Sequence, residues 1–220
     1  MSEVPGPPPG ADAGPLPPPG PAGPCELAEP GRPVTGPGGR PLLRVLAPVE
    51  VLQPDRPVGA PSTWTRAERD RWAVEASLGR PPRSTFAVAV RDAATGDPVV
   101  IRNPPLLADG TPMPTRWWLL AFGPEVGALE ADGGVRAAEA AIGDDALAAA
   151  HRRAAAERDG ALPAGHVGPR PTGGVGGTRR GVKCLHAHYA AWLATGDDPV
   201  GAWVHERLVG PTSPAVQPPR

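Results

Sequence analysis

The sequence predicts an α+β fold, in which a small antiparallel sheet of about three strands is packed by four or five helices, with a disordered arm rich in proline and glycine before it. Three observations predict it. Of the 34 prolines, 18 precede Ser62. Short segments then alternate apolar and polar residues, which is typical of half-buried strands. The second half of the chain repeats its apolar residues at helical spacing.

The disordered arm is predicted over residues 1–61. Stretches such as PGPPPG bury too little apolar surface to offset the entropy lost on ordering, and they favour the polyproline II conformation. One apolar, β-branched segment, residues 41–54, interrupts the arm. It is expected to be an apolar patch within the disordered arm, with two alternatives: it docks as an edge strand, or it binds a partner, in which case the protein would act as a scaffold that recruits partners through its arm.

A single folded domain is predicted over residues 62–209, followed by a disordered tail over 210–220. Its first element is a helix that begins at a capping box of Thr65 and Glu68 and ends at Gly79, because glycine suits the position after a helix. The alternating segments that follow predict two strands joined as a hairpin and then a third strand. These strands are expected over residues 84–91, 98–102 and 116–122.

The remainder of the domain is predicted to be helical. Pro124 suits the first turn of a helix, a second short helix follows, and Asp144 is expected to cap a third helix that ends near Gly160. A loop rich in glycine and proline then leads to a helix over residues 182–195. Its expected core face consists of Val182, Leu185, Tyr189, Trp192 and Leu193, which share one side at 3.6 residues per turn. Asp198 is predicted to cap the last helix.

Composition limits the classes of function. The 22 basic residues nearly balance the 23 acidic ones, so net charge gives no reason to expect nucleic acid or an anionic membrane as a partner. No window of 18 apolar residues suggests a transmembrane helix, and the first 20 residues do not resemble a signal peptide. Two cysteines are too few for a disulfide framework. We therefore expect a cytoplasmic protein.

The candidate site lies where rare residue types gather. The segment GVKCLHAHYAAWL, residues 181–193, holds the single lysine and the single tyrosine of the chain. A helix beginning near Gly181, after a glycine-rich loop and among cations, has free N–H groups that can hold a phosphate or carboxylate. The sequence therefore predicts a domain that binds a small anionic ligand or a protein partner there. The predicted binding residues are Gly177, Arg179, Arg180 and Lys183, with Arg80 and Arg83 as possible additions from a second loop.

Cysteine chemistry is the alternative interpretation. Cys184 and His188 are four residues apart and would share one side of the predicted helix, whereas Cys184 and His186 would lie on opposite sides. A thiol in the first turn of a helix beside cations is activated as a nucleophile. Cys184 would then be the nucleophile of a hydrolase or transferase, with His188 as its base. The sequence alone does not decide whether the protein is an enzyme.

No metal or cofactor is predicted. Zinc takes at least three protein ligands, and only Cys184 and His188 converge on the predicted helix. The glycine-rich loop also lacks the lysine and hydroxyl spacing of a phosphate-binding P-loop.

Four segments of the chain resemble an actinobacterial family known as domain of unknown function 501. They are LGRPPR (78–83), DGTPMPTRWWL (109–119), LAAAHRRAAAERD (147–159) and the stretch from VKCLHAHYAAWL to DPVG (182–201). The chain departs from the family in its first hairpin, where RDAATGDP replaces an Arg-Cys-Pro turn, and in lacking an acidic residue just before VKCLH. The resemblance implies a cytoplasmic bacterial domain and brings no catalytic residues with it.

Overall fold

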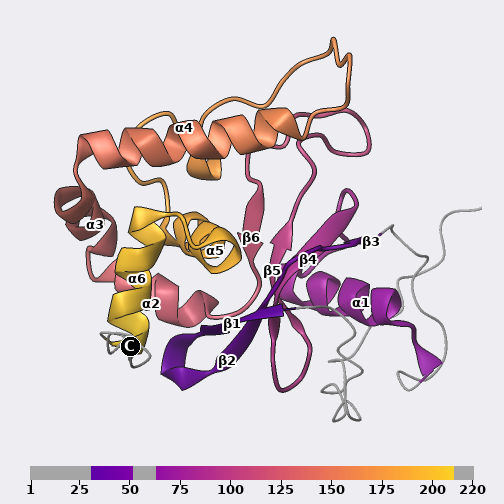
Figure 1. Ribbon diagram of the computed structural model, residues 1–220, viewed down its shortest axis with the longest axis horizontal. Helices are drawn as coiled ribbons and strands as arrows, with labels where there is room; N and C mark the ends of the chain where they lie inside the picture. The colour runs from indigo at the N-terminus through magenta and orange to yellow at the C-terminus, as the bar shows by residue number, and fades with distance from the viewer. Residues whose placement is uncertain (1–30, 52–62, 211–220) are drawn as a thin grey trace, which may run out of the picture.

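The computed structural model describes residues 31–51 and 63–210 (Figure 1). Within these ranges the chain forms an antiparallel sheet of six strands and six α-helices. The α+β class and the antiparallel sheet are therefore confirmed. The prediction of about three strands was wrong, and the helices exceed the predicted four or five by at least one.

The three predicted strands are present as β4 (Phe86–Asp92), β5 (Pro98–Arg102) and β6 (Trp117–Leu119). Three further strands precede them: β1 (Gly31–Thr35), β2 (Pro41–Val45) and β3 (Glu50–Val51). The strands lie in the order β1-β2-β4-β5-β6, and β3 pairs with β4 next to the end of β2. All the pairings are antiparallel.

The three additional strands come from residues 31–51, inside the range predicted as a disordered arm. Each is short, and prolines interrupt the segment, so local sequence gives little strand signal. Pairing with β4 supplies the stabilisation: Leu42 is 1% exposed and Val51 is 7% exposed. Residues 41–51 thus dock on the sheet, which was one of the alternatives for 41–54, but β2 lies between β1 and β4 and is not an edge strand. Residues 1–30, 52–62 and 211–220 lie outside the described part of the chain.

The helices follow the predicted order. Thr65 and Glu68 form the predicted capping box, and Asp198 caps the last helix by accepting from the Gly201 N–H. Asp144 does not cap its helix, because Gly143 takes the N-cap position. The bounds are α1 (Arg66–Leu78), α2 (Gly123–Ala131), α3 (Gly134–Ile142), α4 (Asp144–Gly160), α5 (Leu185–Thr195) and α6 (Pro199–Val209).

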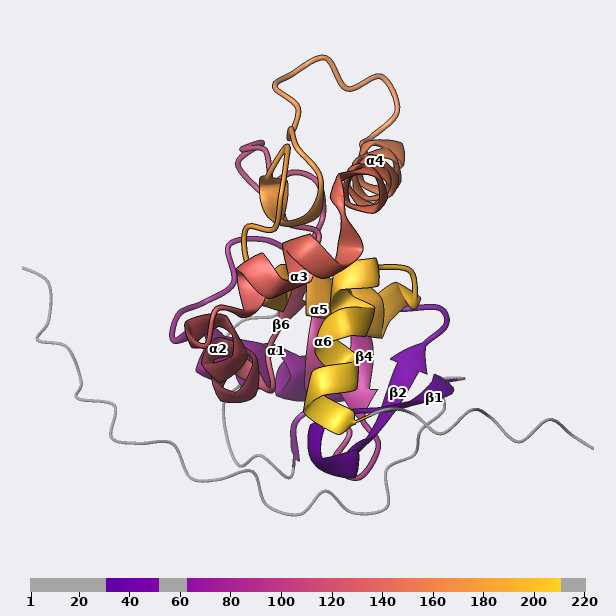
Figure 2. The same ribbon diagram turned by 90° about the vertical axis from the view of Figure 1, so that its left-hand side faces the viewer.

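The helices cover the two faces of the sheet unequally. Helix α1 lies alone on one face, whereas α2, α5 and α6 gather on the other (Figures 1 and 2). Each face has its own apolar cluster, and the larger one lies beneath α5 and α6. Helix α1 is also tied to β4 by a buried ion pair in which both guanidinium Nη atoms of Arg91 bond Asp70, at 2.7 and 2.8 Å.

Helix α5 is the centre of the larger cluster. Leu185, Tyr189 and Leu193 are all 0% exposed, which confirms the buried face predicted from helical spacing. Trp192 is half-buried and packs against His205, with ring centroids 4.1 Å apart. At this same C-terminal end of the helix, Arg44 of β2 donates to the carbonyl oxygens of Leu193 and Trp192. The segment predicted to carry the site is therefore rigidly held.

Candidate functional site

The loop that leads into α5 is fixed by a buried histidine of α4. His151 is 6% exposed, and its Nδ1 accepts from the Val175 N–H at 3.1 Å. A neutral ring that accepts at Nδ1 carries its proton at Nε2, so His151 donates from Nε2 to the Gly181 carbonyl oxygen at 2.9 Å. One side chain thus clamps the loop at two points six residues apart.

A buried arginine holds the beginning of the same loop. Arg158 is 2% exposed, and its Nη1 donates to the Gly173 carbonyl oxygen at 2.6 Å. The glycines that follow are required by close approach: a Cβ on Gly174 would lie 2.4 Å from the His151 Cβ. Gly177 has a φ angle of +78°, a left-handed conformation that favours glycine. A Cβ there would also lie 2.9 Å from the Pro114 Cβ. The glycine-rich composition therefore has a structural reason at these positions.

Helix α5 begins three residues later than predicted. Cys184, with φ −158 and ψ 148, is its N-cap, so the expectation that Gly181 caps the helix and that Cys184 lies in the first turn was wrong. The cause is tertiary. Glu130 at the end of α2 accepts from the Leu185 N–H, and Glu139 of α3 accepts from the Val182 N–H at 2.7 Å.

These two carboxylates occupy the N–H groups that the sequence assigned to a ligand. A helix N-terminus carries partial positive charge, so a carboxylate of the chain itself satisfies it as well as an external anion does. His186 joins the same contact, because its Nδ1 lies 3.2 Å from the Glu130 Oε1 and its Nε2 lies 3.2 Å from the Gly123 carbonyl oxygen. Two N–H groups at the start of α5, those of Val182 and Leu185, are therefore already bonded to carboxylates of the chain.

The predicted cations remain at the surface beside this filled helix start. Arg179, Arg180 and Lys183 are exposed, and Lys183 donates to the Gly176 carbonyl oxygen at 3.3 Å. No ion pair joins any of the three to an acidic residue in the part of the chain that the structure describes. Arg152, which follows the clamping His151 in α4, is also exposed and has no ion pair there. Sequence reasoning did not include Arg152, because only the fold brings α4 against this loop, through the two hydrogen bonds of His151.

The other two predicted binding residues lie elsewhere. Arg83 pairs with Asp109 at 3.5 Å, and the Arg80 guanidinium lies over the Trp118 ring at 5.8 Å. Neither side chain has a hydrogen bond, ion pair or ring contact with residues 173–183. The structure therefore does not bring Arg80 and Arg83 into contact with the other predicted residues.

The cysteine interpretation receives no support from the geometry. His188 is 1% exposed, and its Nδ1 lies 2.9 Å from the Asp198 Oδ2. Its Nε2 is buried without a hydrogen-bond partner, and no hydrogen bond joins Cys184 to His188 in the described structure. Since Cys184 lies outside the helix, the four-residue spacing no longer places the two side chains together. His188 and Asp198 instead form a buried link between α5 and α6.

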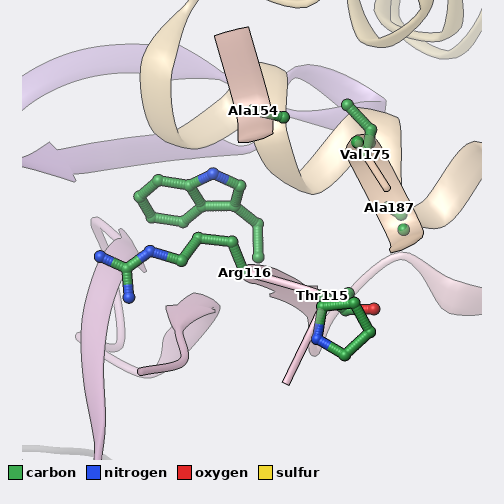
Figure 3. Close-up of a pocket in the computed structure, with 9 residues that line it drawn as sticks. Thr115, Arg116, Ala154, Val175 and Ala187 are labelled. Atoms are coloured by element: carbon green, nitrogen blue, oxygen red, sulfur yellow. The ribbon is translucent and has the colours of Figure 1, made fainter. Parts of the chain in front are cut away.

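Two hollows of the described surface lie near the loop or near α4. Figure 3 shows the hollow beside the loop, with Val175 and Ala187 on one side and the Arg116 side chain extending away from them. Its volume is about 10 Å³, the space of roughly one water molecule. A shallow depression of about 350 Å³ lies between α4 and the start of α6, lined by Ala146, Ala149, Arg153 and Asp197 among others. It includes none of the predicted site residues.

The described ranges contain neither a cluster of metal ligands nor a helix that could span a membrane. Within residues 31–51 and 63–210, no three His, Cys, Asp or Glu side chains are grouped so that they could hold a metal ion. Every helix in those ranges is too short or too polar to span a bilayer.

Comparison with known families adds the classification. A family model described as "Protein of unknown function (DUF501)" matches residues 89–206, which run from β4 to α6 and make up more than half of the chain. The chain belongs to this family. No curated protein and no solved structure matches it. The matched range contains the clamped loop, both capping glutamates and α5, and it leaves out α1 and the three N-terminal strands.

Proposed function

We propose that the protein is a binding domain that takes an anionic group, of a small ligand or of a protein partner, at the cations around Gly181. One observation carries the proposal: Arg179, Arg180 and Lys183 are exposed and lack acidic partners among residues 31–51 and 63–210, although the loop that bears them is fixed by His151 and Arg158. Cations on a rigid loop lose little conformational entropy when they bind, because the backbone is already ordered.

The filled helix start changes the expected mode of recognition. Because Glu130 and Glu139 accept from the N–H groups of Leu185 and Val182, these two groups are not open to an external anion, and the exposed cationic side chains carry its recognition. Arginine offers a planar fork of donors to phosphate or carboxylate, and lysine adds a compact charge. Two phosphoryl groups match three to four separate cations better than one does, so pyrophosphate is the preferred probe.

The abundance of Ala, Gly, Pro and Arg further supports a high-GC actinobacterial source, and a cytoplasmic location stays a prediction.

The test is thermal unfolding of the full chain with phosphate, pyrophosphate or nucleotides at millimolar concentration. A ligand at ten times its Kd stabilises the fold by about 1.4 kcal/mol, which raises the Tm of a domain of this size by about 3–6 °C. Replacing Arg179, Arg180 and Lys183 together by alanine should abolish this shift.

The matched control is Arg69→Ala, because Arg69 is an exposed cation without an ion pair on α1, across the sheet from the site. This variant should keep the full shift. If the triple variant keeps it as well, the cations are not the binding site. If the wild-type protein shows no shift with any of these probes, small phosphorylated ligands are eliminated, and recognition of an acidic partner surface becomes the proposal to test.

A further inference from the structure

The two hydrogen bonds of His151 require a neutral ring. The Val175 main-chain N–H can only donate, at 3.1 Å from Nδ1, and the Gly181 carbonyl oxygen can only accept, at 2.9 Å from Nε2. Protonation adds a hydrogen at Nδ1 that points at the Val175 N–H, so this bond and a charged ring exclude each other. The bond to Gly181 is kept, because Nε2 is a donor in both states.

The other four histidines of the chain do not have this conflict. The ring nitrogens that form their hydrogen bonds lie against oxygen atoms: main-chain carbonyls at His166 and His186, a carboxylate at His188 and a hydroxyl at His205. Oxygen atoms of these kinds can accept from a charged ring. Within the described structure, His151 is therefore the histidine that loses a hydrogen bond when it is protonated.

The segment that this bond holds is a turn bonded within itself. The Gly174 N–H donates to the Thr178 carbonyl oxygen at 2.7 Å, and the Thr178 N–H donates to the Val175 carbonyl oxygen at 3.3 Å. The turn packs closely on the ring, since a Cβ on Gly174 would lie 2.5 Å from the His151 Nδ1. No room is left there for a water molecule that could accept from a protonated Nδ1. A turn bonded in this way moves as one unit when its contact with the ring is lost.

Charged and titratable groups surround the ring from the elements that pack against α4, which are α3, α5, α6 and residues 175–177. They are His188 of α5, Asp198 of α6, Glu139 of α3, Lys183 of the loop, and Arg152 and Arg158 of α4 itself. None of them forms a hydrogen bond or ion pair with the His151 ring in the described structure. A charged ring would be buried without a carboxylate partner, which is unfavourable, and an opened turn that admits water relieves this.

We propose that His151 is a pH-sensitive clamp: its protonation releases residues 174–178 from α4 and lowers the affinity of the neighbouring cations for an anion. The second step rests on the proposed function, because Arg179 and Arg180 follow the turn directly. Cations on a released turn lose more conformational entropy when they bind. Histidine suits such a response, since its charge changes between about pH 5 and 8.

The first measurement is NMR spectroscopy of the full chain between about pH 8 and 5. The His151 ring resonances report protonation, and the ratio of the hydrogen-exchange rates of the Val175 and Val182 amides reports release of the turn. Val182 is the internal reference, because the Glu139 carboxylate accepts from its N–H at 2.7 Å, and the general pH dependence of exchange cancels in the ratio. The loss of one hydrogen bond should raise the ratio about 2- to 12-fold as the ring becomes charged.

Two results refute the clamp as a switch. In one, the His151 ring takes up its proton and the exchange ratio stays constant. In the other, the ring stays neutral over the whole range while the protein is folded.

The second measurement is calorimetric titration with sulfate, which keeps its double negative charge over this range. The Kd should rise by the same factor between the two ends of the pH range in the wild-type protein. The change should disappear in His151→Gln, whose side chain takes up no proton. The matched control is His166→Gln, which removes another histidine of the loop after α4 and should keep the change.

The two measurements separate this proposal from the proposed function. If the exchange ratio rises and the Kd for sulfate stays constant, the turn is not coupled to the anion site and the proposal is overturned. If the ratio rises and sulfate does not bind at any pH, the clamp responds to pH as proposed, and the anion site itself is refuted.

Discussion

Replacing His151 by leucine tests whether one buried side chain holds the proposed site in place. The change keeps an apolar body of similar size but removes the acceptor for the Val175 N–H and the donor to the Gly181 carbonyl oxygen. Each buried group left unpaired costs about 1–3 kcal/mol. Because Gly181 is only half-buried and water can reach it, we expect a total loss of about 2–4 kcal/mol, or roughly 4–16 °C in Tm.

The assay is urea unfolding followed by circular dichroism, with Arg152→Leu as the matched control. Arg152 is the next residue of α4 and is exposed without an ion pair, so its replacement should change stability by less than about 0.5 kcal/mol. The His151 variant should also lose most of the thermal shift given by pyrophosphate, since Arg179 and Arg180 would be held on a looser loop. A His151→Leu protein within about 0.5 kcal/mol of wild type would refute the clamp.

Three other predictions follow from buried groups. Leu42→Ala should destabilise the fold by about 2–5 kcal/mol, because Leu42 is 1% exposed. Leu43→Ala, at the half-buried neighbour, should cost less. If urea unfolding showed almost no loss of stability for either variant, β2 would not pack on the sheet. Burial raises the pKa of Tyr189, and the Glu125 charge adds to the effect, so the absorbance at 295 nm should show no ionisation of this single tyrosine near pH 10 while the protein stays folded. Burial lowers the pKa of His205, against a smaller opposite effect of Glu206. As the pH falls below about 6.5, the unfolded chain therefore binds a proton at this histidine before the folded chain does. The free energy of unfolding of the wild-type protein should then drop between pH 7 and 5 more than that of His205→Phe, and parallel pH profiles would contradict this.

The elements that depend on local signals were predictable from the sequence. The capping box of α1, the β4–β5 hairpin and the buried face of α5 each rest on residues close together in the chain. In α5, the spacing of Leu185, Tyr189 and Leu193 identified the core face correctly, although the helix starts later than expected. The assignment of the buried face stays correct when the helix start is misplaced, because moving the boundary does not change which residues share a face.

The elements that depend on distant partners were not predictable. Strands β1 to β3 lie in a proline-rich segment and are recognisable only once β4 is there to pair with them. The sequence placed the start of α5 wrongly because Glu130 and Glu139 bind it from other helices, and no local sequence pattern predicts that contact. His205 is 4% exposed because Trp192 packs against it from α5, and this contact also depends on the fold.

The caps of α5 have a consequence for the order of folding. Its first turn is bonded by Glu130, 55 residues earlier, and its last turn by Arg44, 149 residues before Leu193. Contacts of such high sequence separation form late, because long loops must close before they contribute. The central helix of the domain should therefore be among the last to become stable during synthesis and refolding. Glu130→Gln should accordingly speed unfolding and leave the refolding rate nearly unchanged, as expected for an interaction absent from the transition state.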